Sequence, residues 1–164
     1  MSKVITGLFD NASQATLAIY RLEALGISEA DISVVANDSY AKEDFAVDEG
    51  TKAAEGGILG AASGGIIAAI VGGFTAVGTV ATGGTGLLVA GPLVAAFAAG
   101  GAGAAVGGTL GAAIGAFIPE HEIKYYEDAI EKGSILIGVK YSSDNKNAIE
   151  EILNNAGASN VSTA

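Results

Sequence analysis

Cysteine is absent from the 164-residue sequence, and its absence excludes disulfide bridges, thiolate metal sites and cysteine nucleophiles. Tryptophan is also absent and histidine occurs only once, which leaves little imidazole chemistry for catalysis or metal binding. Lysine and arginine together number 8 against 18 acidic residues, so the formal net charge is −10. A nucleic-acid-binding protein would present a basic surface that this composition lacks. We therefore expect no enzymatic activity, no cofactor, no bound metal and no nucleic-acid partner.

A secretion signal is also missing from the first residues. A signal peptide has a basic region followed by an apolar run, whereas residues 1–10 have the pattern of a polar start, a strand and a turn. This pattern predicts a protein that begins in the cytoplasm.

A length of 164 residues corresponds to about one domain.

The charges are confined to the two ends of the chain. The 64 residues from 56 to 119 contain no ionisable side chain, although the other 100 residues hold all 26 charges. This central block has 19 glycines, 17 alanines and 20 valine, isoleucine, leucine and phenylalanine residues. Such a composition is unsuited to a segment exposed to water. It indicates that two chemically different parts are joined in one chain.

The N-terminal part alternates strand-like and helix-like patterns. A β-branched run over 3–9 predicts a strand, and Asn11 is a typical N-cap for the helix that follows. Apolar residues at helical spacing predict that this helix ends at Leu25, where Gly26 supplies a left-handed residue. Residues 32–36 predict a second strand. Because a helix connects them, the two strands should be parallel neighbours or be separated by one other strand.

The same order returns after the uncharged block. A proline at its start predicts a helix over 119–132, and the apolar run 135–141 predicts the strongest strand, in a central position. Ser143 is the expected N-cap of a further helix, which Gly157 closes. Residues 160–163 predict a last strand.

Together these elements predict an α+β protein with the order strand, helix, strand, insertion, helix, strand, helix, strand. This order is that of a ferredoxin-like sandwich split by an inserted α-helical glycine-zipper hairpin. We expect residues 1–50 and 119–164 to form the ferredoxin-like domain together, because neither end buries enough apolar surface alone. Residues 51–118 are the expected Gly/Ala-rich insertion.

The insertion repeats small residues at every fourth position. This spacing gives a helix a face on which another backbone can approach closely. The repeat predicts two helices, about 56–77 and 92–118, joined by a glycine- and threonine-rich tip over 78–91. The residues expected to mediate helix packing and oligomerisation are Gly56, Gly60, Gly64, Gly72, Gly103, Gly107, Gly111 and Gly115.

Each expected helix is long enough to cross a membrane. Their lengths are about 33 and 40 Å at 1.5 Å per residue, against a hydrocarbon core of roughly 30 Å. Each helix nevertheless carries only 8 strongly apolar residues, and no cluster of lysine or arginine flanks it. Two arrangements therefore stay open. The first is a membrane hairpin with the polar domain at the cytoplasmic side of the inner membrane, and the second is a large cytoplasmic oligomer that buries its hairpins between subunits.

A set of short motifs in a fixed order covers nearly the whole chain. The motifs are Val-Ile-Thr-Gly-Leu-Phe-Asp at 4–10, Ala-Leu-Gly-Ile-Ser at 24–28, Asp-Ile-Ser-Val-Val at 31–35, Ile-Pro-Glu-His-Glu at 118–122, Tyr-Tyr-Glu at 125–127 and Gly-Ser-Ile-Leu-Ile at 133–137. The first three resemble the opening of the bacterial general stress protein family with the heat-induced YflT-type domain. The last three, with the Gly/Ala-rich block before them, resemble the longer members that contain glycine zippers. The resemblance implies a stress-associated protein with a membrane association, and it implies no catalytic residues.

Two functions are compatible with these patterns. The first is a non-enzymatic structural or interaction protein that self-assembles through glycine-zipper helices in or on a membrane, with further copies of itself and lipid as partners. The second is a small-ligand-sensing regulatory module with a hydrophobic hairpin as its anchor, in which the ligand is unknown. An enzyme is disfavoured because the polar ends show no nucleophile with a matching base.

Overall fold

The computed structural model describes residues 3–37, 87–91, 118 and 121–163. The strands are β1 (Lys3–Phe9), β2 (Ile32–Asn37), β3 (Leu87–Ala90), β4 (Ile135–Tyr141) and β5 (Asn160–Thr163). The helices are α1 (Ala12–Ala24), α6 (Ile123–Glu131) and α7 (Lys146–Asn155), and a short 3-10 turn (Glu29–Asp31) precedes β2. The α+β class that the sequence predicts is confirmed.

The five strands of the described residues form one antiparallel sheet in the order β3-β2-β4-β1-β5. β4 lies between β1 and β2, so of the two arrangements that the sequence leaves open, the structure has the one in which a single strand separates the first two strands. β4 is also the middle strand, as its apolar run predicts. A continuous apolar run suits this position because both faces of a central strand are buried.

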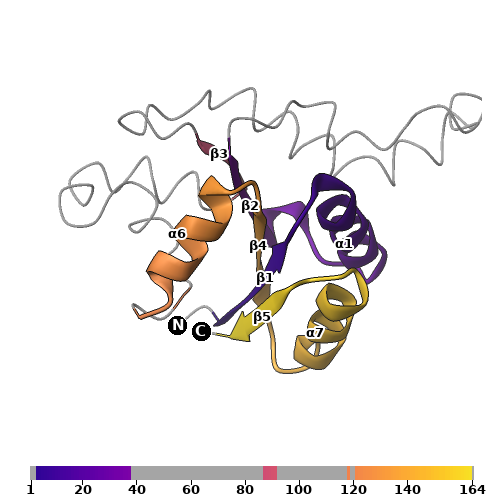
Figure 1. Cartoon of the computed structure of the whole chain (residues 1–164). Helices are drawn as coiled ribbons and strands as arrows, with labels where there is room; N and C mark the ends of the chain where they lie inside the picture. The colour runs from indigo at the N-terminus through magenta and orange to yellow at the C-terminus, as the bar shows by residue number, and fades with distance from the viewer. Residues whose placement is uncertain (1–2, 38–86, 92–117, 119–120, 164) are drawn as a thin grey trace, which may run out of the picture.

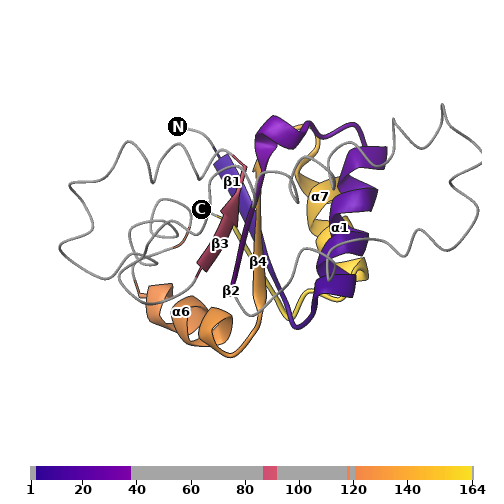
Figure 2. The same ribbon diagram turned by 90° about the horizontal axis from the view of Figure 1, so that it is seen from above.

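One face of the sheet is covered by α1 and α7, which pack side by side (Figures 1 and 2). Alternate residues of each strand belong to this face, and the register places Ile5, Val139 and Ile32 in one row across β1, β4 and β2. These side chains are fully buried against Ile19 of α1 and Leu153 of α7. This layer is the main hydrophobic core.

The opposite face of the sheet carries α6 (Figure 1). A second, smaller core lies between α6 and the sheet, and it contains Leu8, Val35, Ile118, Tyr126, Ile130 and Leu136. Leu8, Leu136 and Val35 are register partners on β1, β4 and β2, so they form one apolar row under the helix. The sheet is therefore buried on both faces where α6 crosses it.

Each of the three α-helices in the described part of the chain is followed by a glycine in the left-handed region. The φ angles are +91° at Gly26, +101° at Gly133 and +94° at Gly157. The residue after each glycine donates its N–H to a carbonyl oxygen in the last turn, with N–O distances of 3.0 Å for Ile27 to Leu22, 2.9 Å for Ser134 to Ala129 and 3.1 Å for Ala158 to Leu153. These are Schellman-type ends, and they confirm the roles predicted for Gly26 and Gly157.

The start of α6 differs from the sequence prediction. The helix begins at Ile123 rather than at 119, because His121 and Glu122 form a turn before it. Proline fixes only its own φ and does not force the residues after it into a helix. Pro119 itself lies outside the described residues.

The start of α7 also differs, since its N-cap is Asn145 and not Ser143. The Asn145 Oδ1 atom accepts hydrogen bonds from the backbone N–H of Ser142 at 2.8 Å and from the Ser142 hydroxyl at 3.2 Å. Asparagine favours such a local side-chain turn. This turn holds residues 142–145 and delays the helix.

Residues 87–90 form the strand β3, which differs from the hairpin tip predicted from the sequence. The sequence places residues 87–90 in the connection 78–91, but they pair with β2, from Val34 opposite Ala90 to Asn37 opposite Leu87. The outer edge of β2 offers unpaired backbone groups, and a short apolar run bounded by glycines can satisfy them. The expected helix over 56–77 and all eight packing glycines lie outside the described residues, as does the expected helix over 92–118 except for Ile118, which is a buried bend.

Candidate functional site

A row of small and hydroxyl-bearing residues crosses the sheet on the face that carries α6. The strand register pairs Ser162 with Thr6, Thr6 with Gly138, and Gly138 with Ser33. These four residues, on β5, β1, β4 and β2, are called the hydroxyl row. It runs directly beside the apolar row that α6 covers, so it lies at the margin of the second core.

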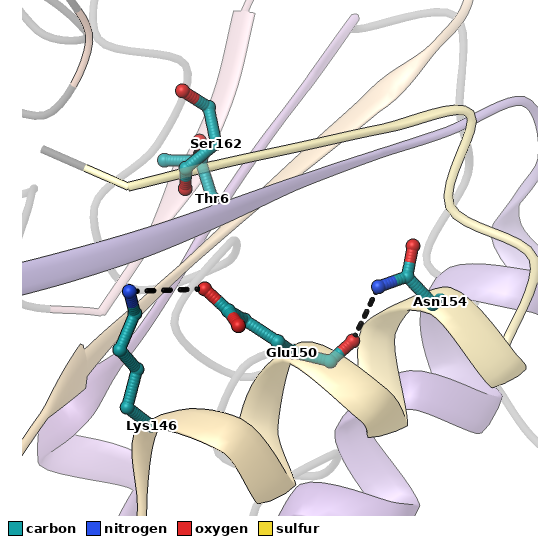
Figure 3. Close-up of polar contacts among 5 residues, drawn as sticks. All are labelled: Thr6, Lys146, Glu150, Asn154 and Ser162. Atoms are coloured by element: carbon teal, nitrogen blue, oxygen red, sulfur yellow. Dashed lines mark hydrogen bonds and ion pairs between the residues drawn. The ribbon is translucent and has the colours of Figure 1, made fainter.

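Thr6, Gly138 and Ser33 of the hydroxyl row are buried, and Ser162 at its end is half-buried. Thr6 is 1% exposed and Ser33 is 5% exposed. The Thr6 hydroxyl donates to the backbone carbonyl of Ser162 at 3.3 Å, and Figure 3 shows the two residues next to each other on neighbouring strands. A Cβ atom built at Gly138 would meet Val4 Cγ1 at 3.7 Å and Ser33 Cβ at 4.0 Å, which are ordinary contact distances. The centre of the row therefore has little side-chain bulk.

Tyr126 of α6 reaches the hydroxyl row at Thr6. Its side chain is fully buried, and the Thr6 side chain is a hydrogen-bonding group beside its hydroxyl, although no hydrogen bond of good geometry to that hydroxyl forms within the described part of the chain. Burial raises the pKa of Tyr126 above its ordinary 10.0, the Thr6 side chain lowers the pKa in part, and Glu122 and Tyr125 raise it further. The phenol is therefore protonated at neutral pH. Its O–H group can donate a hydrogen bond.

A second unpartnered oxygen lies at the start of α6. The Oε2 atom of Glu122 is buried and has no hydrogen bond within the described residues. The other carboxylate oxygen, Oε1, is 3.8 Å from Nε2 of His121, whose side chain is 79% exposed. The Glu122 charge is near enough to Tyr126 to contribute to its raised pKa. Within the described residues, Glu122 Oε2 and the Tyr126 hydroxyl are thus two buried oxygens without a hydrogen bond of good geometry, at the N-cap and in the first turn of α6.

The groups in this arrangement are suited to hydrogen bonding. A neutral phenol, two buried hydroxyls and a carboxylate can hold a small polar group by hydrogen bonds. They do not form a nucleophile activated by a base. In residues 3–37, 87–91 and 121–163, no group of three or more histidine, cysteine, aspartate or glutamate side chains is placed to hold a metal ion.

The polar outer face of α7 is an ordinary solvated surface. Lys146 Nζ lies 3.4 Å from Glu150 Oε1, and the Asn154 side-chain amide donates to the Glu150 carbonyl at 2.8 Å (Figure 3). Exposed pairs four residues apart contribute only about 0.3–0.5 kcal/mol. These contacts stabilise the helix end and do not form a site.

The hydroxyl row and Tyr126 are not among the site residues predicted from the sequence. One signal in the sequence concerns the face of the sheet. Residues two positions apart on a strand point to the same face, and an apolar residue that α6 covers lies two positions from each of Thr6, Ser33 and Gly138. Their alignment into one row depends on the pairing of strands far apart in the chain. The hydrophobic pattern of one strand does not specify which residue of a distant strand lies opposite it, so the row could not be predicted from the sequence.

Among the described residues, no helix combines the length and the apolar character needed to cross a membrane. Comparison of the chain with known protein families, with curated proteins and with solved structures finds no match.

Proposed function

We propose that this chain is a non-enzymatic, stress-associated structural protein that self-assembles through its glycine-rich segments in or on a membrane. Its proposed partners are further copies of itself and lipid, at the cytoplasmic side of the inner membrane or within a large cytoplasmic oligomer. The eight glycines named above are the proposed packing residues. The uncharged block supports self-assembly, because apolar surface of this extent is unfavourable in water. The resemblance to general stress proteins supports the role in stress.

The observation that carries the proposal is the pairing of β3 with β2. Asn37 and Leu87 are cross-strand partners, so the two ends of the 49-residue stretch 38–86 are held at the same place on the sheet. Ala90 belongs to the sheet and Ile118 is buried in the second core, so both ends of the stretch 92–117 are also held by one domain. A segment with both ends on one domain crosses a membrane an even number of times or not at all. This supports two apolar segments engaged from one side, in place of a single spanning hairpin.

The finer fold that we propose is a ferredoxin-like sandwich formed by β1, α1, β2, β4, α7 and β5. The order β2-β4-β1-β5 and the position of both helices on one face support it, since a βαββαβ unit has this arrangement. In this scheme, β3 and α6 belong to the insertion between the second and third strands of the sandwich.

Labelling of single cysteines tests the one-sided arrangement, and the cysteine-free sequence makes each label unambiguous. Thr82→Cys reports on the tip expected from the sequence, and Tyr20→Cys on the outer face of α1 is the matched control. In intact cells, a maleimide that does not cross membranes should label neither cysteine, and after lysis it should label both. Labelling of Thr82→Cys alone in intact cells would contradict the arrangement.

Particle mass tests the self-assembly. The purified full-length protein should scatter light as a multimer, in detergent or without it. It should also float with lipid vesicles in a density gradient. A monomer that stays at the bottom of the gradient would refute both parts of the proposal.

A second candidate function is the sensing of a small neutral polar ligand at the hydroxyl row. The buried hydroxyl of Tyr126 favours it, because no hydrogen bond of good geometry satisfies this group within the described residues, and a buried polar atom without a hydrogen bond costs about 1–3 kcal/mol that a ligand can recover. Small polyols and amides are suitable probes in a thermal-shift assay. A rise in Tm that Tyr126→Phe abolishes and Tyr125→Phe retains would support this function. No rise with any probe would count against it.

A further inference from the structure

The outer edge of β2 is a specific binding position for residues 87–91, and it is called the seat. β3 pairs with β2 over four register positions, from Asn37 opposite Leu87 to Val34 opposite Ala90. Gly91 follows at φ +85°, and a Cβ atom there would overlap the Ile32 carbonyl oxygen and lie 2.9 Å from Ser33 Cα. Both neighbours are backbone atoms that cannot move aside cheaply. The seat therefore accepts a short strand that is followed at once by glycine.

Long segments connect this strand to the rest of the chain on both sides. Residues 38–86 precede it and residues 92–117 follow it before the chain reaches Ile118. The advantage of an intramolecular partner over an intermolecular one falls as the tether grows. A four-residue strand paired along one edge is also among the more easily opened parts of a sheet. The same strand from another copy is therefore a strong competitor when copies are concentrated.

β3 is also placed between the two segments that carry the proposed packing glycines. The first set of these glycines ends at Gly72, and the second begins at Gly103. If the segments associate between copies, as the proposed function holds, the strand between them is carried to the sheet of a neighbouring copy. The two associations then reinforce each other.

We propose that β3 is exchanged between copies, so that β2 of one copy pairs with residues 87–91 of a second copy. The inference rests on the proposed self-assembly and adds to it a defined contact. Each copy donates one strand and accepts one, which is the geometry of domain swapping. The exchange adds backbone hydrogen bonds to the packing of small residues and fixes the register between neighbours.

Engineered disulfides test the exchange directly in the cysteine-free chain. Two differently tagged full-length copies are produced together, one with Val35→Cys and the other with Val89→Cys, whose Cα atoms are register partners. Mild oxidation should give a disulfide-linked dimer that carries both tags. The control pairs Val35→Cys with Leu87→Cys, which is two residues out of register, and it should give about tenfold less dimer because the cysteines are too far apart.

A second pair avoids the second core, to which Val35 belongs, and uses Ala36, which is buried in the main core on the other face. Ala36→Cys with Leu88→Cys is also in register and involves the opposite face of the sheet. In the double variant Val35→Cys/Val89→Cys, both cysteines are in one chain and can form an intrachain disulfide. If this intrachain disulfide forms, both co-produced pairs give no mixed dimer and light scattering still shows a multimer, the exchange is wrong. The proposed self-assembly is then retained. A monomeric mass with closure within one chain would reject both proposals.

Discussion

At the scale of single residues, Gly26 and Gly91 require glycine for different physical reasons. Gly26 ends α1 at φ +91°, and no atom lies within 4 Å of the position that a Cβ atom would take, so only its backbone conformation requires glycine. Gly91 combines a φ of +85° with close backbone neighbours, so both conformation and space require glycine. The same residue type therefore tolerates substitution very differently at the two positions.

We expect Gly91→Ala to release β3 from β2, because the added methyl group overlaps the Ile32 carbonyl. Amide hydrogen exchange of Leu87–Ala90 should then accelerate by about tenfold or more, as for a strand that opens locally. Gly26→Ala is the matched control. It should lower the free energy of unfolding by about 1–2 kcal/mol through its left-handed φ alone and leave β3 protected. Equal protection of β3 in both variants would contradict the seat described for Gly91.

The buried phenol of Tyr126 predicts a pH dependence of stability. Burial raises the folded-state pKa above the ordinary 10.0, so the folded protein holds this proton more tightly than the unfolded chain. The stabilisation is complete below about pH 10 and is lost as the pH rises through the folded-state pKa. The free energy of unfolding of the wild type should therefore fall more steeply above pH 10 than that of Tyr126→Phe. Tyr125→Phe should retain the steep fall, and identical curves for wild type and Tyr126→Phe would exclude this effect.

At the scale of elements, local signals predict helix ends better than helix starts. Gly26 and Gly157 end their helices as predicted, because a left-handed residue is a local backbone requirement. Asn11 caps α1 as predicted, with its side chain accepting from the Gln14 N–H at 3.0 Å. Ser143 does not cap α7, since several polar residues compete there and Asn145 forms the turn. A start that has several candidate caps depends on which local hydrogen bond forms.

This difference between two caps gives a matched prediction. Asn11→Ala should lower the free energy of unfolding by about 1 kcal/mol, because it removes the acceptor for an N–H in the first turn of α1. Ser143→Ala should change it by less than about 0.5 kcal/mol, since this exposed residue is not the cap. Chemical denaturation measures both values. A larger loss for Ser143→Ala than for Asn11→Ala would overturn the assignment of the caps.

At the scale of the whole molecule, the sheet brings together strands from distant parts of the chain. β1 from the N-terminal part lies between β4 and β5 from the C-terminal part, and β3 attaches at the outer edge of β2. The proposed assembly adds the glycine-rich segments to this framework. A substitution in these segments should therefore change the assembly without changing the folding of the described domain.

Gly107→Leu with Gly111→Leu should weaken the assembly and leave the domain folded. Two bulky side chains on a small-residue face keep neighbouring backbones apart. Light scattering should show a smaller or heterogeneous particle, while circular dichroism in the same sample shows the secondary structure of the wild type. An unchanged particle mass after both substitutions would remove these glycines from the packing surface.

The sequence by itself determined the α+β class, the central position of β4 and the left-handed ends of α1 and α7, because each depends on local hydrophobic pattern or on a local backbone requirement. Only the tertiary structure decided that residues 87–90 join the sheet, and that Thr6, Gly138 and Ser33 form one row beside Tyr126. A four-residue apolar run has the same composition in a tip and in a strand. Its state is decided by whether a free strand edge lies within reach, and that is a property of the folded sheet.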